Sequence, residues 1–128
     1  MITITNLIWS FNKETHRVQL LLVKRKDEPF ADRWALPETL LLLRENESAD
    51  QAAVRLIKEK IGLDLPETST EQLATFTSPH RTPGERALAL TYMTYLPAMP
   101  NLRPGYGASD VAWFAFENFG HKYELFSR

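Results

Sequence analysis

Residues 47–63, ESADQAAVRLIKEKIGL, constrain the fold of this chain more than any other segment. Ser48 and Gln51 have the spacing of a capping box, in which each side chain bonds to the other residue's backbone at a helix start. Gly62 stands about four turns later, where a helix is expected to stop because glycine adopts a left-handed backbone without strain. The segment therefore predicts one helix with well-defined ends.

The helical period divides the side chains of this segment into two groups. One broad apolar side is typical of core packing, and it carries Ala53, Val54, Ile57 and Ile61. A neighbouring arc of mixed chemistry is typical of the wall of a binding site, and it carries Arg55, Leu56, Glu59 and Lys60. We therefore expect the helix to pack on a core and to present this arc to a ligand.

The same residues resemble the signature of the Nudix hydrolases, G-x5-E-x7-R-E-U-x-E-E-x-G-U, in which U is a bulky aliphatic residue. The positions that agree are Glu47, Arg55, Ile57, Glu59, Gly62 and Leu63. The first glycine is replaced by Leu41, and two carboxylates that hold metal in the family are replaced by Leu56 and Lys60. The resemblance implies an α/β fold, an α/β/α sandwich with a mixed β-sheet. Residues 41–63 are called the signature segment below.

The two lost carboxylates leave two interpretations open. In the first, Lys60 places a positive charge where the family's metal stands, so that an anionic ligand is held without being cleaved. In the second, Leu56 extends the core, and the ammonium of Lys60 reaches water along its apolar stem. In both interpretations Arg55 has a structural role between Glu47 and Glu59, the latter one helical turn away.

The phrase EPFADRWALPE lies just before the signature segment in the sequence. It resembles the stretch that leads into the signature in the Nudix family and contributes to the diphosphate site there. Trp34, Leu36 and Pro37 match that stretch, whereas Glu38 and Thr39 replace two glycines. Those glycines allow the backbone to come close to substrate phosphates. Their loss argues against the usual diphosphate cradle.

Length and composition exclude several classes of protein. The 128 residues suit a single domain, 1–128, which buries about two-thirds of its unfolded surface. The absence of cysteine excludes a disulfide framework and a thiol nucleophile, and it fits a cytoplasmic protein. Fifteen basic and sixteen acidic residues give no broad electrostatic surface for nucleic acid. No apolar run reaches the roughly 20 residues of a membrane span, so no membrane partner is expected.

Strand-like stretches surround the helix, rich in β-branched and aromatic residues. They are residues 2–11, 18–23, 40–43, 71–78, 87–96 and 111–116. The first two are expected to form a hairpin. The tail, residues 117–128, has Phe119, Tyr123 and Phe126 at near-helical spacing, and we expect it to begin a helix.

Two later phrases, EQLATFTSPHRTPGERALALTYMTYLP and GASDVAWF, resemble the Nudix-related transcriptional regulators of NAD and sugar metabolism. In that group a Nudix-like domain senses ADP-ribose or a related phosphorylated sugar, often as a dimer, and precedes a winged helix. The resemblance implies a small phosphorylated ligand, a homodimer as one assembly, and no direct contact of this domain with nucleic acid. A winged helix would lie outside these residues.

Several cationic side chains are candidates for holding phosphate, because arginine pairs with it through bidentate hydrogen bonds. They are Arg25, Arg33, Lys60 and Arg81. Trp34 and Phe30 are candidates for stacking on an adenine, and His80 for contacting an anion. The alternative for each is an ordinary structural role: a solvated arginine, a core aromatic or a surface histidine.

Three functions remain open. The first is a non-catalytic sensor without a cofactor, in which the remnants Glu47, Arg55 and Glu59 have structural roles. The second is a Mg²⁺-dependent pyrophosphohydrolase, with Glu47 and Glu59 as metal ligands and Glu38 or Glu45 as additional acids. The third is a protein-interaction module with an empty pocket.

Overall fold

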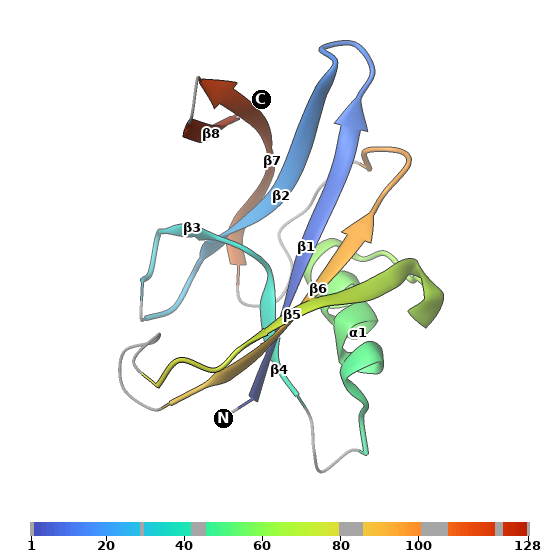
Figure 1. Cartoon of the computed structure of the whole chain (residues 1–128), viewed down its shortest axis with the longest axis vertical. Helices are drawn as coiled ribbons and strands as arrows, with labels where there is room; N and C mark the ends of the chain where they lie inside the picture. Colours follow the sequence, from blue (N-terminus) through green and yellow to red (C-terminus); the bar gives the residue numbers. More distant parts are fainter. Residues whose placement is uncertain are drawn as a thin grey trace.

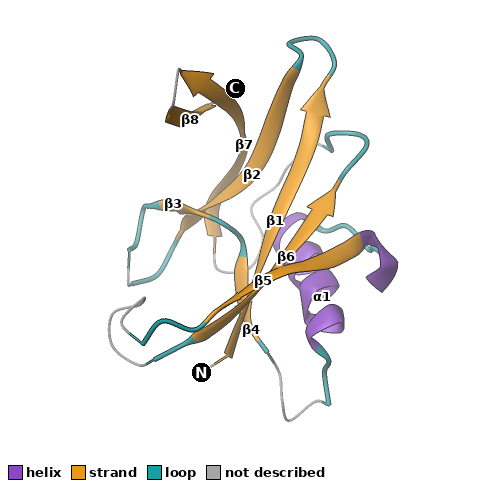
Figure 2. Ribbon diagram, in the orientation of Figure 1, coloured by secondary structure: helices purple, strands orange, loops and turns teal. Residues whose placement is uncertain are grey.

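A computed structural model describes residues 2–28, 30–41, 46–79, 86–100, 108–119 and 122–127. Its strands form one mixed sheet, and helix α1 (Ala49–Ile61) packs on one face of that sheet (Figure 1). A short 3₁₀ helix, η2 (Glu67–Ser69), follows α1 (Figure 2). The strands are β1 (Ile2–Asn12), β2 (Arg17–Arg25), β3 (Trp34–Ala35), β4 (Glu38–Leu40), β5 (Thr70–Phe76), β6 (Leu88–Tyr95), β7 (Ala108–Phe119) and β8 (Lys122–Ser127).

The strand order in the sheet is β5-β6-β1-β2-β7-β8. β1 and β2 form the predicted antiparallel hairpin, whereas β1 and β6 run parallel. Parallel neighbours need a crossover connection, and the chain between β1 and β6 supplies it through α1. The α/β class and the mixed sheet predicted from the sequence are therefore confirmed. Within the described residues α1 is the one α-helix.

One edge of β1 is shared between two strands. β4 pairs with residues 3–5 of β1, and β2 pairs with residues 9–12. Beyond that pairing, β2 leaves β1 and pairs with β3. Between the two pairings, the backbone N–H of Asn6 donates to the carbonyl of Pro37 over 3.1 Å. The end of β2 and the start of β4 therefore flank the middle of β1.

The ends of α1 follow the local signals in the sequence. The Ser48 hydroxyl accepts from the Gln51 N–H at 3.1 Å, and the Gln51 side chain accepts from the Ser48 N–H at 2.9 Å. Gly62 has φ +76° and donates to the carbonyl of Lys58 at 2.9 Å. Both predicted ends of the helix are confirmed.

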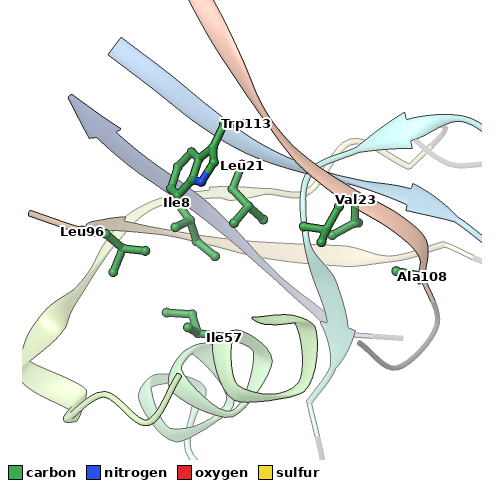
Figure 3. Packing of buried hydrophobic residues seen from close by; sticks show 8 residues of the cluster. Ile8, Leu21, Val23, Ile57, Leu96, Ala108 and Trp113 are labelled. Atoms are coloured by element: carbon green, nitrogen blue, oxygen red, sulfur yellow. The ribbon is translucent and has the colours of Figure 1, made fainter. Parts of the chain in front are cut away.

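The core lies between α1 and the sheet. Ile57 points from the helix toward Ile8, Leu21 and Trp113, which come from three neighbouring strands (Figure 3). Burial of each such large apolar side chain stabilises the fold by about 1.5–3 kcal/mol. Ile61 packs against the same cluster, as expected for the apolar side of the helix.

A second core cluster corrects one prediction about the helix. Leu56 was expected on the site wall, but its side chain is 0% exposed and packs with Ile4, Ala53 and Tyr92. The physical reason is that Tyr92 of β6 and Ile4 of β1 lie directly under this turn of α1. The alternative interpretation, that Leu56 extends the core, is confirmed.

Buried hydrogen bonds also hold the helix in place. The Asn6 side-chain amide donates to the backbone carbonyl of Ala53 at 3.2 Å, and the Thr94 hydroxyl donates to the Asn6 side-chain oxygen Oδ1 at 2.9 Å. The Tyr92 hydroxyl donates to Asp50 at 2.6 Å, and burial together with this carboxylate raises the pKa of Tyr92 far above its ordinary value. The start and the middle of α1 are thus tied to β1 and β6.

Two predicted elements differ from the structure. Residues 122–127 form strand β8, antiparallel to β7, so the expected helix in the tail is wrong. Aromatic residues favour strands, and pairing with β7 prevails over a spacing that also fits a helix. The strand expected at residues 40–43 begins earlier, as β4, and residues 42–43 lie outside the described part of the chain.

Candidate functional site

Arg55 is the centre of the signature segment. Its Nε donates to Glu47 at 2.6 Å and its Nη2 to the other oxygen of the same carboxylate at 3.0 Å. Its Nη1 donates to Glu59 at 2.6 Å and to the Thr39 hydroxyl at 3.2 Å, and Nη2 also reaches the carbonyl of Leu40 at 2.7 Å. The bond to Glu47 is the main reason that the pKa of Arg55 is raised. Arg55 therefore connects the helix to β4 and engages both remaining carboxylates.

Lys60 is buried, with only 8% of its surface exposed. The interpretation in which its ammonium reaches water stays a prediction, because the exposed fraction of the whole residue does not locate the ammonium. Lys60 lies one turn after Leu56 on the same side of α1. Desolvation lowers the pKa of Lys60, and Arg25 lowers it further, while Glu59 and Glu38 act in the opposite direction.

These electrostatic interactions define one site. Arg25 comes from the end of β2, Glu38 from the start of β4, and Glu59 and Lys60 from the last turn of α1. The four residues are called the Lys60 cluster below. Arg25 and Glu38 come from strands that share one edge of β1, and both act electrostatically on Lys60. The cluster thus combines a buried lysine with one more cation and two carboxylates.

The lowered pKa of Lys60 has a consequence for stability at different pH. Below its folded-state pKa both states bind the proton, and the full desolvation cost applies. Between that pKa and the ordinary value of 10.5, the unfolded state binds more protons, so stability rises with pH. We expect Lys60→Met to be more stable than wild type by about 1–2 kcal/mol at neutral pH, with the difference shrinking toward pH 10.5. Urea denaturation of both proteins across this range tests it, and a constant difference would contradict it.

The donor set does not fit a Mg²⁺ ion, which needs several oxygen ligands around it. Glu47 and Glu59 are both hydrogen-bonded to Arg55, and Glu59 also interacts electrostatically with Lys60. In the described part of the chain, no three acidic, histidine or cysteine side chains gather as a metal site. Glu45, named as an additional acid, lies outside the described residues.

The structure describes only some of the other predicted ligand residues. Arg33 is exposed, and its carbonyl accepts from the Arg25 N–H at 2.9 Å, so its backbone adjoins the Lys60 cluster. Trp34 is 37% exposed and meets the ring of Phe114 edge-on, with centroids 5.0 Å apart. Arg81 and His80 lie outside the described residues, and their roles stay predictions.

Glu38 is the residue whose position the sequence indicated least. It was considered only as an acid for a hydrolase, yet it acts on the ammonium of Lys60 and accepts from the Thr5 hydroxyl at 3.5 Å. The signal that could have placed it is its position directly after Leu36 and Pro37, at the entrance to the signature segment.

Comparisons with known proteins agree with this architecture. The family profile described as NUDIX domain matches residues 3–127. The ADP-ribose pyrophosphatase of Methanocaldococcus jannaschii is 30% identical over 100 residues, covering 78% of this chain and 56% of that protein. Among the described residues, no helix is long and apolar enough to cross a membrane.

Solved structures give the same fold. A MutT/nudix family protein from Enterococcus faecalis has a TM-score of 0.91 and 31% identity, over 99% of this chain and 48% of that one. The NUDIX domain of Shewanella oneidensis NrtR, solved with ADP ribose, has a TM-score of 0.77 and 24% identity, over 88% and 71%. The chain thus spans about half the length of the pyrophosphatase and of the Enterococcus protein.

Proposed function

The chain belongs to the NUDIX family, and from this premise we propose that it binds ADP-ribose or a related phosphorylated nucleotide sugar without cleaving it. The observation that carries the proposal is the buried Lys60, which stands at a position where the family has a metal-binding carboxylate. A fixed ammonium attracts phosphate directly. It also repels a divalent cation.

The electrostatics favour an anionic ligand at the Lys60 cluster. Desolvation makes the charged form of Lys60 less favourable in the folded protein than in water, as its lowered pKa indicates. A phosphate oxygen about 4 Å away gains about 4 kcal/mol per unit charge at an effective dielectric of about 20, before screening. The negative charge of the ligand thus compensates for the free-energy cost of desolvating Lys60 on folding. Arg25, from the end of β2, adds a second positive charge.

A role as the sensing part of a transcriptional regulator suits this binding activity. The similar NrtR has been solved both with ADP ribose and with a 27mer DNA. This chain spans 49% of the NrtR bound to DNA, so a comparable regulator would need residues beyond these. We propose a cytoplasmic sensor that acts on DNA only through another domain, with a homodimer as its assembly.

A second function is favoured by one observation, the similarity to an ADP-ribose pyrophosphatase. In that case the protein would hydrolyse a nucleoside diphosphate derivative with Mg²⁺, using Glu47 and Glu59. The engagement of both carboxylates by Arg55 argues against it. Assays of ADP-ribose turnover with Mg²⁺ and with Mn²⁺ separate the two functions, and robust metal-dependent turnover would overturn the sensor.

Replacement of Lys60 tests the proposed binding directly. We expect Lys60→Met to lower the affinity for ADP-ribose by about tenfold or more, because one charged contact to phosphate is lost. The matched control is Lys58→Met on the same helix; the Lys58 side chain is 63% exposed and its ammonium pairs with Asp64 at 3.2 Å. Isothermal titration calorimetry measures both. Equal affinities of the Lys60 and Lys58 variants would contradict the site.

The sign of the stability change makes this test specific. Lys60→Met is expected to be more stable than wild type at neutral pH, so weaker binding cannot be attributed to unfolding. A variant that loses both stability and affinity would point to a general disruption of the fold.

A further inference from the structure

Three buried polar side-chain atoms in the described part of the chain form no hydrogen bond, and two of them belong to the paired strands β2 and β7. These two are the side-chain oxygen Oε1 of Gln19, which is 2% exposed, and the indole nitrogen Nε1 of Trp113, which is 4% exposed. The third, Oγ1 of Thr3, lies on the other face of the sheet, because Thr3 alternates with Ile4. Buried polar groups in native proteins are nearly always paired with protein or with ordered water. Gln19 and Trp113 therefore need a partner.

Gln19 and Trp113 are neighbours on the face of the sheet that carries the core. Gln19 pairs with Ala115, and Leu21 pairs with Trp113, so Gln19 and Trp113 are diagonal neighbours across one pair of strands. Alternate residues of a strand share a face, which places Gln19 on the side where Leu21 and Trp113 pack with Ile57 of α1 (Figure 3). Diagonal positions in a sheet lie about 7–8 Å apart, within reach of aromatic and long side chains. One small molecule can therefore contact both unpaired atoms.

The two unpaired atoms have opposite hydrogen-bonding roles. The indole N–H of Trp113 can only donate, and the amide oxygen of Gln19 can only accept. They form no hydrogen bond with each other, so a direct contact does not satisfy them. A metal cation does not fit between them either, because the indole presents a hydrogen atom and no lone pair. A molecule that both accepts and donates is required.

Ser10 of β1 supplies a third polar group beside these two. It pairs with Gln19 across the hairpin and is 0% exposed. Its hydroxyl donates to the carbonyl of Leu96 over 2.6 Å, so the Ser10 oxygen can still accept a hydrogen bond. Buried water molecules typically make about three hydrogen bonds to otherwise unsatisfied groups. One donor and two acceptors match the two hydrogens and a lone pair of a single water molecule.

We propose that Trp113, Gln19 and Ser10 form a buried binding site for one water molecule, which links β7, β2 and β1 through their side chains. The water accepts from Nε1 of Trp113 and donates to Oε1 of Gln19 and Oγ of Ser10. This site is independent of the proposed function, because none of its three residues belongs to the Lys60 cluster. The water exchanges with solvent only when the core opens locally, so it stays bound for a long time compared with surface water.

The test is NMR detection of magnetisation transfer between water and the indole N–H of Trp113 in the whole chain. A long-lived bound water gives cross-peaks of opposite sign in the NOE and ROE spectra, and we expect such a pair of cross-peaks at this N–H. Gln19→Met keeps the length of the side chain but removes the amide oxygen, so the pair should be lost. The matched control is Gln72→Met on β5, whose side chain is exposed and donates to Thr75 over 3.1 Å, and it should keep the pair.

The Gln19 variant also separates bound water from a relay through the Ser10 hydroxyl, whose proton exchanges with solvent. That hydroxyl is still present in Gln19→Met, so cross-peaks that persist in this variant would overturn the inference. A crystal structure of the wild-type protein is the second measurement and needs no variant to fold. We expect one ordered water about 3 Å from all three atoms. A map without this water, or with a direct bond between Gln19 and Trp113, would overturn the inference and leave the proposed function standing.

Discussion

Leu56→Glu is expected to lower the free energy of unfolding by more than about 4 kcal/mol, which is enough to unfold a domain of this size. The carboxylate would enter a cluster in which Ile4, Ala53 and Tyr92 surround a side chain that is 0% exposed. Urea denaturation followed by circular dichroism measures the loss. A soluble Leu56→Glu protein with the wild-type midpoint would contradict this account of the core.

The control is Leu56→Met, which conserves volume and polarity and should cost less than about 1.5 kcal/mol. A large difference in the free energy of unfolding between these two variants has a consequence for experiments on hydrolysis. Restoring both family carboxylates, with Leu56→Glu and Lys60→Glu together, cannot serve as a test for recovered hydrolysis. The absence of a metal-binding carboxylate at Leu56 is a property of the core as well as of the site.

Arg55→Met is expected to lower the free energy of unfolding by about 2–4 kcal/mol. The variant would leave the Glu47 carboxylate, whose side chain is only 10% exposed, without its guanidinium partner. It would also free the carbonyl of Leu40 and the side chain of Glu59. The same denaturation measurement applies, and a loss below about 1 kcal/mol would contradict the central role of Arg55.

Two controls separate charge from geometry in this prediction. Arg55→Lys keeps the positive charge but loses the planar fork, so it should lose most of the same stability. Arg86→Met removes an exposed arginine whose Nη2 donates to the carbonyl of Thr77 at 3.2 Å, and it should change stability far less. Wild-type stability in Arg55→Lys would mean that charge alone matters at this position.

The helix and its partners show which features could be predicted from the sequence. Ser48, Gln51 and Gly62 specify the ends of α1 through contacts within a few residues, and these predictions are confirmed. The pairing of Arg55 with Glu59 also follows from their i,i+4 spacing, whereas that of Arg55 with Glu47 was expected from the family signature. Such features depend on neighbours along the chain, which the sequence displays directly.

The features that were missed depend on distant strands. The burial of Leu56 requires Tyr92, which is 36 residues away in sequence and arrives with β6. The desolvation of Lys60 depends on how β2 and β4 approach the helix. The tail was ambiguous because Phe119, Tyr123 and Phe126 suit a helix or a strand, and only pairing with β7 decides between them.

The parallel pairing of β1 with β6 affects the order of events during synthesis. Ile2 pairs with Leu88 and Trp9 pairs with Tyr95, so the first strand made lacks this partner until nearly three-quarters of the chain exists. A nascent chain that stops at Leu63 contains the whole signature segment, yet nothing from β6 lies under α1. Ribosomes add about 5–20 residues per second, so these apolar surfaces wait for seconds near the exit tunnel. Helix α1 therefore reaches its full core packing only in a chain completed through β6, and chaperones that shield exposed strands can act before that point.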